Sequence, residues 1–290
     1  MKAWPWIVVT SALLAVPAPV DAQPDTPSPA SSHVYREIGD QALHAYVFQP
    51  PARRADGKAP AILLFHGGGW SAGGADWVFP RARRFADLGL VAIAIQYRLS
   101  EGEVTPVDAL GDACAAFQWV RAHAAELGLS GLLAGYGVSA GGQLVAATVT
   151  IGCPQDGLAG RPVGPDALLL WSPALDLVDD GWFSAKLQGR ATAAALSPAR
   201  HVGPATPPTS IVHGECDTLS PLRGVQRYCA QLAEQGRPCD LHVYAGLGHL
   251  LTRNLAQQEG DYDPDPKARA DGMAQQELFL RKQGFLPEIR

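Results

Sequence analysis

The sequence predicts an α/β protein with a mainly parallel central sheet and helices on both faces. Continuous apolar runs such as Ala61–Phe65 and Leu90–Tyr97 are typical of strands that are buried on both sides. These runs alternate with longer segments of helical periodicity such as Val107–Leu127, and repeated βα units of this kind favour parallel strands. With 290 residues, 47% of them hydrophobic, the chain can bury one large core.

The alternation begins at residue 33 and continues to the end of the chain. Gly39-Asp40 separates two short strand patterns, which predicts an antiparallel hairpin. Pro106 is suited to the first turn of the long helix that follows it. The stretch 176–208 is a long insert after the sixth strand, and we expect either a small lid or surface decoration there. The expected strands are 34–38, 42–48, 61–65, 90–97, 132–136, 167–171, 209–213 and 241–244, and the expected helices are 76–88, 107–127, 143–151, 222–235 and 267–283.

The first 22 residues have the pattern of a secretory signal peptide. Lys2 supplies a positive charge, residues 4–20 are apolar, and Ala22 is a small residue before an expected cleavage site at Gln23. A membrane anchor is the alternative, but the apolar stretch is short and contains three prolines. We therefore expect an exported protein, periplasmic or secreted, with a flexible Pro/Ser-rich lead-in at 23–32 and one domain at 33–290.

Composition excludes several other functions. The formal net charge of −5, without a clustered basic face, argues against nucleic-acid binding. No zinc-type Cys/His spacing, phosphate-binding loop or internal repeat is present in the sequence, so we expect no metal and no cofactor. After removal of the leader, no segment is apolar enough to cross a bilayer, and the oligomeric state is open.

Five cysteines raise the question of disulfides. Export permits disulfides, but an odd number leaves at least one thiol over in a monomer. Cys229 and Cys239 are candidates for a pair because a short turn sequence, QGRP, separates them; alternatively, all five are small buried apolar residues. The cysteines are Cys114, Cys153, Cys216, Cys229 and Cys239.

Two glycine-rich motifs indicate nucleophilic catalysis. Residues 137–141, GVSAG, match G-x-S-x-G between a predicted strand and a predicted helix, where a sharp turn would expose Ser139. The stretch HGGGW follows the third predicted strand. Bare glycine backbone there allows an oxygen to approach N–H groups, which would stabilise a tetrahedral oxyanion. We expect the N–H groups of Gly68, Gly69 and Ala140 to form this oxyanion hole.

These motifs resemble those of the α/β-hydrolase superfamily, in particular the HGGG-type esterases near hormone-sensitive lipase and the bacterial acetyl and feruloyl esterases. The resemblance covers residues 60–285 and implies the α/β-hydrolase fold. One departure is Val138, where lipase-like relatives carry an acidic residue before the serine. The matching segments are HGGGW, YRL at 97–99, GVSAGG, WSP at 171–173, HGECD at 213–217 and GLGH at 246–249.

A serine nucleophile needs a histidine base and a carboxylate that orients the base. The order serine, acid, histidine favours His249, because His242 should lie within the last strand. The resemblance points to Asp217 as the acid, at the end of the HGECD segment. Glu215 is an alternative acid, and Asp217 could instead cap the following helix.

Several neighbouring residues have open roles. We assign His66 a structural role, in which it hydrogen-bonds backbone and fixes the glycine loop. Trp70 and Trp171 are candidate substrate-binding residues, although most aromatic side chains simply pack. Trp182 and Phe183 are weaker candidates for lining an acyl or aromatic pocket. Asp176 and Asp179 are expected to be solvated loop carboxylates. Together these features predict a serine esterase.

The predicted reaction is hydrolysis of a carboxylic ester through an acyl-enzyme. The resemblance and the expected export favour short acyl groups, including acetyl or feruloyl esters, on small molecules or on polysaccharides. A formamidase or other amide hydrolase is the alternative, because the same residues can cleave related bonds. A catalytically inactive binding module is a further alternative, since a protein can keep its fold after its catalytic activity is lost.

Overall fold

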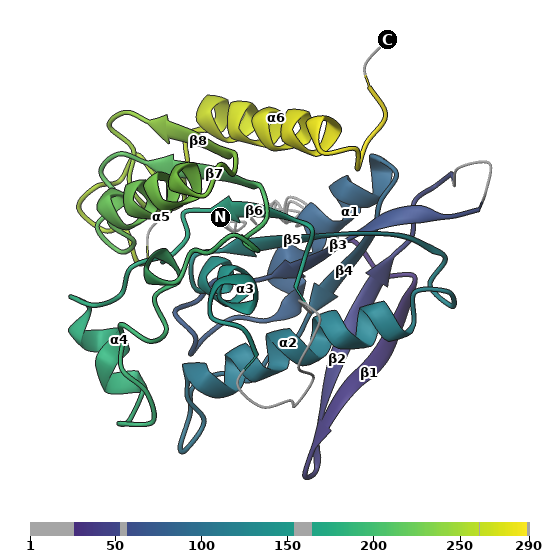
Figure 1. The fold of residues 1–290 in the computed structure, drawn as a ribbon, viewed down its shortest axis with the longest axis horizontal. Helices are drawn as coiled ribbons and strands as arrows, with labels where there is room; N and C mark the ends of the chain where they lie inside the picture. Colours follow the sequence, from purple (N-terminus) through teal and green to yellow (C-terminus); the bar gives the residue numbers. More distant parts are fainter. Residues whose placement is uncertain (1–25, 53–56, 154–163, 261, 289–290) are drawn as a thin grey trace, which may run out of the picture.

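The central sheet has eight strands within the residues that the computed structural model describes, which are 26–52, 57–153, 164–260 and 262–288 (Figure 1). Its strand order is β1-β2-β4-β3-β5-β6-β7-β8. The first two strands form the predicted antiparallel hairpin, β2 is antiparallel to β4, and every later pair is parallel. The strands are β1 (Ser31–Ile38), β2 (Gln41–Phe48), β3 (Ala59–Phe65), β4 (Val91–Ile95), β5 (Leu129–Val138), β6 (Ala167–Trp171), β7 (Thr209–Gly214) and β8 (Cys239–Tyr244).

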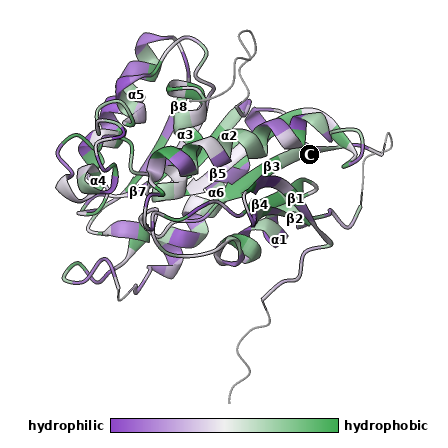
Figure 2. Ribbon diagram, turned by 90° about the horizontal axis from the view of Figure 1, so that it is seen from below, coloured by the Kyte–Doolittle hydropathy of each residue, from purple (hydrophilic) through white to green (hydrophobic). Residues whose placement is uncertain are grey.

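Helices cover both faces of this sheet, as the sequence predicts. One apolar core lies between the sheet and α1 with α6, and a second lies between the sheet and α2, α3 and α5. Figure 1 shows α6 and α2 on opposite sides of the sheet, and Figure 2 shows that the central strands carry the hydrophobic residues. The helices are α1 (Phe79–Asp87), α2 (Pro106–Ala122), α3 (Ala140–Thr150), α4 (Gly181–Lys186), α5 (Leu222–Glu234) and α6 (Pro266–Lys282), with 3₁₀ turns at Ala75–Val78, Pro198–Arg200 and His249–Leu251.

Several boundaries differ from the sequence prediction; for example, β5 begins at residue 129 instead of 132, and α3 begins at residue 140 instead of 143. The expected helix 76–88 is a 3₁₀ turn followed by α1, because Pro80 has no N–H for a helical bond to residue 76. The expected helix 107–127 ends at Ala122, and the chain then turns through Gly128, at a φ of 67°, into β5. The predicted lead-in 23–32 overlaps β1, since Ser31 and Ser32 already pair with β2.

The insert after β6 packs onto the rest of the domain. Phe183 in α4 and Leu187 after it are fully buried in the core on the α2–α3–α5 face. The Ser197 hydroxyl accepts a hydrogen bond from the N–H of Leu177 (2.9 Å), which ties the two ends of the insert together. The insert is therefore part of the folded domain, and its first residues reach the edge of the sheet where the predicted catalytic groups lie.

Two disulfides link the described cysteines. The expected pair Cys229–Cys239 is confirmed, and it joins α5 to β8. Sequence reasoning did not single out the second bond, between Cys114 of α2 and Cys153 after α3. Cys216 is free. The predicted leader, residues 1–22, lies outside the described residues, and no helix among those described has the length and apolar character that crossing a bilayer requires.

Candidate active site

Ser139 lies on a sharp turn between β5 and α3. Its backbone has φ 52° and ψ −116°, a conformation that side-chain-bearing residues rarely adopt. The turn is tight: a Cβ on Gly137 would lie 2.4 Å from the carbonyl oxygen of Gly141, and a Cβ on Gly141 would lie 2.4 Å from the carbonyl oxygens of Phe65 and His66. The glycines of the motif are thus required by close backbone packing, which holds the serine at the sheet's edge.

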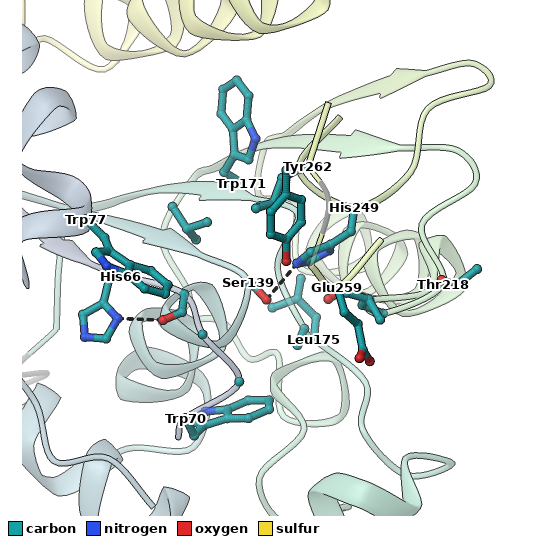
Figure 3. A pocket seen from close by; sticks show the side chains of 18 of the residues that line it. His66, Trp70, Trp77, Ser139, Trp171, Leu175, Thr218, His249, Glu259 and Tyr262 are labelled. Carbon is teal, nitrogen blue, oxygen red and sulfur yellow. Dashed lines mark hydrogen bonds between the residues drawn. The ribbon is translucent and has the colours of Figure 1, made fainter. Parts of the chain in front are cut away.

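The structure brings the three predicted triad residues into one hydrogen-bonded chain. The Ser139 hydroxyl lies 3.0 Å from Nε2 of His249 (Figure 3). Nδ1 of His249 lies 2.8 Å from Oδ2 of Asp217. Both contacts are satisfied when His249 carries its proton on Nδ1, because Nε2 can then accept from the hydroxyl. His249 and Asp217 are buried, so water competes little for these bonds.

The carboxylate of Asp217 is held by the turn that follows β7. The N–H groups of Leu219 and Ser220 donate to its Oδ1 at 3.0 and 2.8 Å, which leaves Oδ2 for His249. Asp217 therefore does not cap α5, whose N-cap residue is Pro221 and which receives no side-chain capping bond; its two oxygens are divided between the turn and His249. Glu215, the alternative acid, is exposed and accepts instead from the N–H of Gly246 (3.1 Å).

A second histidine, His213, lies beside Asp217 but is not part of the hydrogen-bonded chain of Ser139, His249 and Asp217. His213 is fully buried, and its Nε2 donates to the carbonyl of Ser220 at 2.7 Å. Burial lowers the pKa of His213, so its ring is neutral near pH 7. The charge of Asp217 consequently remains available to His249.

Gly68 and Gly69 form a loop that faces Ser139 from the end of β3. Both have positive φ, of 106° and 58°, which favours glycine. A Cβ on Gly68 would lie 2.2 Å from the carbonyl oxygen of Ala72, and one on Gly69 would lie 2.5 Å from the Trp182 ring. Their N–H groups have no acceptor among the described residues. The oxyanion role stays a prediction, and this loop supplies the free donors that it needs.

His66 fixes the glycine loop, and its predicted structural role is confirmed. Its Nδ1 donates to the carbonyl of Gly67 at 2.6 Å, and its ring stacks on Tyr97 with centroids 4.3 Å apart. The Tyr97 hydroxyl donates to the His66 carbonyl at 2.9 Å. Burial lowers the pKa of His66 to about 4, so the ring is neutral and makes these contacts uncharged near pH 7.

A cavity of about 1050 Å³ opens beside Ser139 and His249. Both aromatic candidates line it, but Trp70 is nearly buried and its Nε1 donates to Gln143 at 3.0 Å. Trp171 is also largely buried beneath the cavity wall, whereas Trp182 is about half exposed at the cavity. Phe183 is enclosed in the core and does not line the cavity.

Known proteins resemble this chain in both sequence and structure. A family profile described as the α/β hydrolase fold matches residues 62–195. An esterase from Thermogutta terrifontis with bound propionate superposes with a TM-score of 0.77 at 28% identity, covering 92% of this chain and 98% of that one. The chain has the α/β-hydrolase fold. It is also 36% identical over 132 residues to the carboxylesterase NlhH of Mycobacterium tuberculosis, which is 44% of this chain and 38% of NlhH.

A further relative of this α/β hydrolase matches over a longer range. The esterase LipI of Mycobacterium tuberculosis is 28% identical over 225 residues, 70% of this chain and 69% of LipI. The match to NlhH, in contrast, spans little more than a third of that protein's length. A second structure of the Thermogutta terrifontis esterase, phosphoramylated by tabun, has a TM-score of 0.78 at 28% identity.

Sequence reasoning missed one part of this site, the loop between His249 and α6. The loop closes at its base through a bridge between Thr252 and Pro264, and Figure 3 shows two of its residues, Glu259 and Tyr262, beside His249. Burial raises the pKa of Tyr262, so its phenol stays neutral near pH 7. One sequence feature could have indicated this loop: the long stretch 250–265 has no helical pattern and follows a candidate catalytic histidine.

Gln258, within this segment, joins the loop that carries Asp217 to the loop that carries His249. Its Oε1 accepts from the N–H of His249 (2.8 Å) and from the N–H of Thr218 (3.2 Å). Its Nε2 donates to the carbonyl of Cys216 at 3.0 Å, and the side chain is almost completely buried. One amide thus spans the loop that carries the acid and the loop that carries the base. Among the described residues, no group of three or more His, Cys, Asp or Glu side chains could hold a metal ion.

Proposed function

We propose that this protein is a serine carboxylesterase that hydrolyses short-chain esters through an acyl-enzyme. The observation that carries the proposal is the hydrogen-bonded chain from Ser139 through His249 to Asp217, on a strained turn beside a cavity. The carboxylesterase NlhH and the esterase LipI, both similar to this chain, support the reaction class. Structures of the similar Thermogutta terrifontis esterase contain propionate or butyrate, which supports short acyl groups.

In the proposed mechanism, the Ser139 hydroxyl attacks the ester carbonyl while His249 Nε2 accepts its proton. Asp217 stabilises the imidazolium that forms, and the N–H groups of Gly68, Gly69 and Ala140 stabilise the oxyanion. His249 then donates its proton to the departing alcohol. Water attacks the acyl-enzyme with His249 as base, and the acid leaves as Ser139 recovers its proton.

The N–H of Ala140 supports this oxyanion hole for a second reason. Ala140 is the first residue of α3, so its N–H has no carbonyl partner within the helix. The positive end of the helix dipole also lies at this point and favours a developing negative charge. Trp182 packs against Gly69 at the same loop.

The direct test combines an ester series with an active-site label. We expect hydrolysis of p-nitrophenyl acetate and butyrate, a falling kcat/KM from octanoate to palmitate, and stoichiometric fluorophosphonate labelling at Ser139 that abolishes activity. Labelling at another residue would contradict the assigned nucleophile. Cleavage of N-formyl aromatic amides in preference to every ester would favour the amide-hydrolase alternative. The absence of both labelling and turnover would favour a binding module.

Gln258→Ala should slow catalysis more than it weakens substrate binding. The truncation leaves the buried N–H of His249 without its acceptor and releases the loop carrying Asp217 from the loop carrying the base. We expect kcat to fall about tenfold to a hundredfold, with KM changed less than threefold, because small displacements of catalytic groups are costly.

The matched control for this prediction is Gln257→Ala, at the neighbouring exposed position of the same loop. It should leave kcat within a factor of about two, since surface substitutions are usually mild. Steady-state kinetics on p-nitrophenyl butyrate measure both variants, and thermal melts show whether they fold. An unchanged kcat in a folded Gln258→Ala variant would contradict the positioning role.

We also propose that residues 1–22 form a secretory leader and that the mature enzyme is exported. The two disulfides support this, because such bonds persist mainly in oxidising compartments. The mature N-terminus, read from protein recovered outside the cytoplasm, should be Gln23. Recovery of the uncleaved chain in the membrane fraction would favour an anchor instead.

A further inference from the structure

One wall of the cavity beside Ser139 carries unpaired positive charge. Three arginines line it: Arg81 and Arg84 of α1, and Arg269 of α6. Arg84 donates to Glu277 at 2.7 Å and is neutralised there. Arg81 and Arg269 have no carboxylate within ion-pair distance and no side-chain hydrogen-bond acceptor among the described residues. Two guanidinium groups therefore face the substrate cavity without a partner.

Arg81 is held in place by aromatic rings. Its guanidinium carbon lies 5.1 Å from the centroid of the Trp171 ring and 5.5 Å from that of Tyr136, and both rings are buried. In such cation–π contacts the rings attract the charge without being conventional hydrogen-bond acceptors, so the guanidinium N–H groups remain free to donate. The charge is thus positioned before any ligand binds.

The arginine wall lies close to the nucleophile. The carbonyl of Trp171, the residue under Arg81, accepts a hydrogen bond from the N–H of Ser139 at 2.9 Å. The α6 helix, which carries Arg269, packs on the same tryptophan, since a Cβ on Gly272 would lie 3.0 Å from the Trp171 ring. Arg81 accordingly lies over Trp171, and Arg269 lines the cavity from the helix that packs on the same ring.

The carboxylates of the cavity do not cancel this charge. Asp180 caps α4 by accepting from the N–H of Phe183 (2.9 Å), and Glu259 lies beyond ion-pair distance of both Arg81 and Arg269. The two remaining carboxylates belong to the insert side and already have arginine partners. These pairs are Asp176 with Arg200 and Arg227, and Asp179 with Arg223.

We propose that the cavity recognises an ester that carries a carboxylate, through Arg81 with Arg269 in support. This inference rests on the proposed esterase function and specifies its substrate class. A carboxylate accepts two parallel N–H bonds from the planar edge of a guanidinium, a match that a neutral ester chain lacks. The pre-stacked Arg81 would therefore discriminate between an anionic ester and a neutral ester of the same length.

The test compares two matched pairs of esters. Monomethyl glutarate against methyl hexanoate places the carboxylate on the acyl side, and 4-acetoxybutyrate against pentyl acetate places it on the alcohol side. We expect one anionic ester to exceed its neutral match in kcat/KM by about tenfold at low salt, and the ratio to shrink as NaCl is added. Which pair responds identifies the side of the ester that faces Arg81.

Arg81→Gln should reduce that ratio about tenfold, and Arg269→Gln should reduce it by a smaller factor because its side chain is more exposed. Arg83→Gln is the matched control on α1, because Arg83 pairs with Asp87 outside the cavity and should leave the ratio unchanged. Arg269→Gln also provides a second variant should Arg81→Gln fail to fold.

The outcomes separate the two proposals. Hydrolysis of the neutral esters with no preference for either anionic match overturns the carboxylate subsite and leaves the esterase proposal standing. An anionic preference that survives in folded Arg81→Gln and Arg269→Gln variants also overturns it. If the protein hydrolyses none of the four esters and none of the p-nitrophenyl esters, the esterase function itself is overturned.

Discussion

Ser139→Ala is expected to lower kcat for p-nitrophenyl butyrate by about a millionfold, with little change in stability. The Ser139 hydroxyl is the only group that the proposed mechanism places in covalent contact with the acyl carbon. Alanine keeps the backbone turn, because the hydroxyl makes no structural bond other than its contact with His249. Residual turnover would come from the N–H groups of the glycine loop and α3, which stabilise an oxyanion formed by attacking water.

The control for this variant is Ser184→Ala, on the exposed surface of α4 and outside the cavity lining. It should hydrolyse the ester at the parent rate. The active sites in the Ser139→Ala preparation must be titrated with a fluorophosphonate, so that activity from traces of the parent enzyme is not attributed to the variant. If Ser139→Ala keeps more than about a thousandth of the parent kcat, Ser139 is not the nucleophile.

Asp217→Asn should lower kcat by about ten thousandfold while the site keeps its shape. The side-chain oxygen of asparagine can still accept from the N–H groups of Leu219 and Ser220, which fixes the side chain. Its NH₂ group would then face Nδ1 of His249 in place of the carboxylate oxygen. The imidazole is thereby forced to carry its proton on Nε2, and a protonated Nε2 cannot accept the proton of Ser139.

Glu215→Gln is the matched test of the alternative acid. Glu215 is exposed and bonds only the backbone of Gly246, so we expect kcat within a factor of about two of the parent value. A large loss in Glu215→Gln together with a small one in Asp217→Asn would reverse the assignment.

The order of elements could be predicted because the signals are local. Apolar runs such as 61–65 and 167–171 are long enough to identify buried strands, and Pro106 marks a helix start. Boundaries were harder where a single residue overrides a periodic pattern, as Pro80 does at α1. Ser139 and His249 could be named because each follows a strand at the same edge of a parallel sheet, in the required chain order. Asp217 was indicated by the resemblance of the HGECD segment to related esterases.

Other parts of the site depend on contacts between distant segments and leave no local signature. Nothing in the local sequence distinguishes Gln258 from any other glutamine in a loop. Its role arises only because the loop folds back over Cys216 and His249. The disulfide between Cys114 and Cys153 likewise depends on how α2 packs beside α3. Helical periodicity indicates which face of α1 is polar, but it does not reveal that Arg81 lies over Trp171 without a carboxylate partner.

By itself, the sequence determined that this chain alternates strands and helices and that a serine, a histidine and an acid follow three of those strands. These properties depend on hydrophobic periodicity and on turn chemistry, which act over a few residues. Only the tertiary structure decided that the three groups meet at hydrogen-bond distance, that four glycines around the site have no room for a Cβ, and that two arginines stay without a carboxylate partner in the cavity. The physical reason is that such contacts join residues far apart in sequence, and their distances are set by how the helices pack on the sheet.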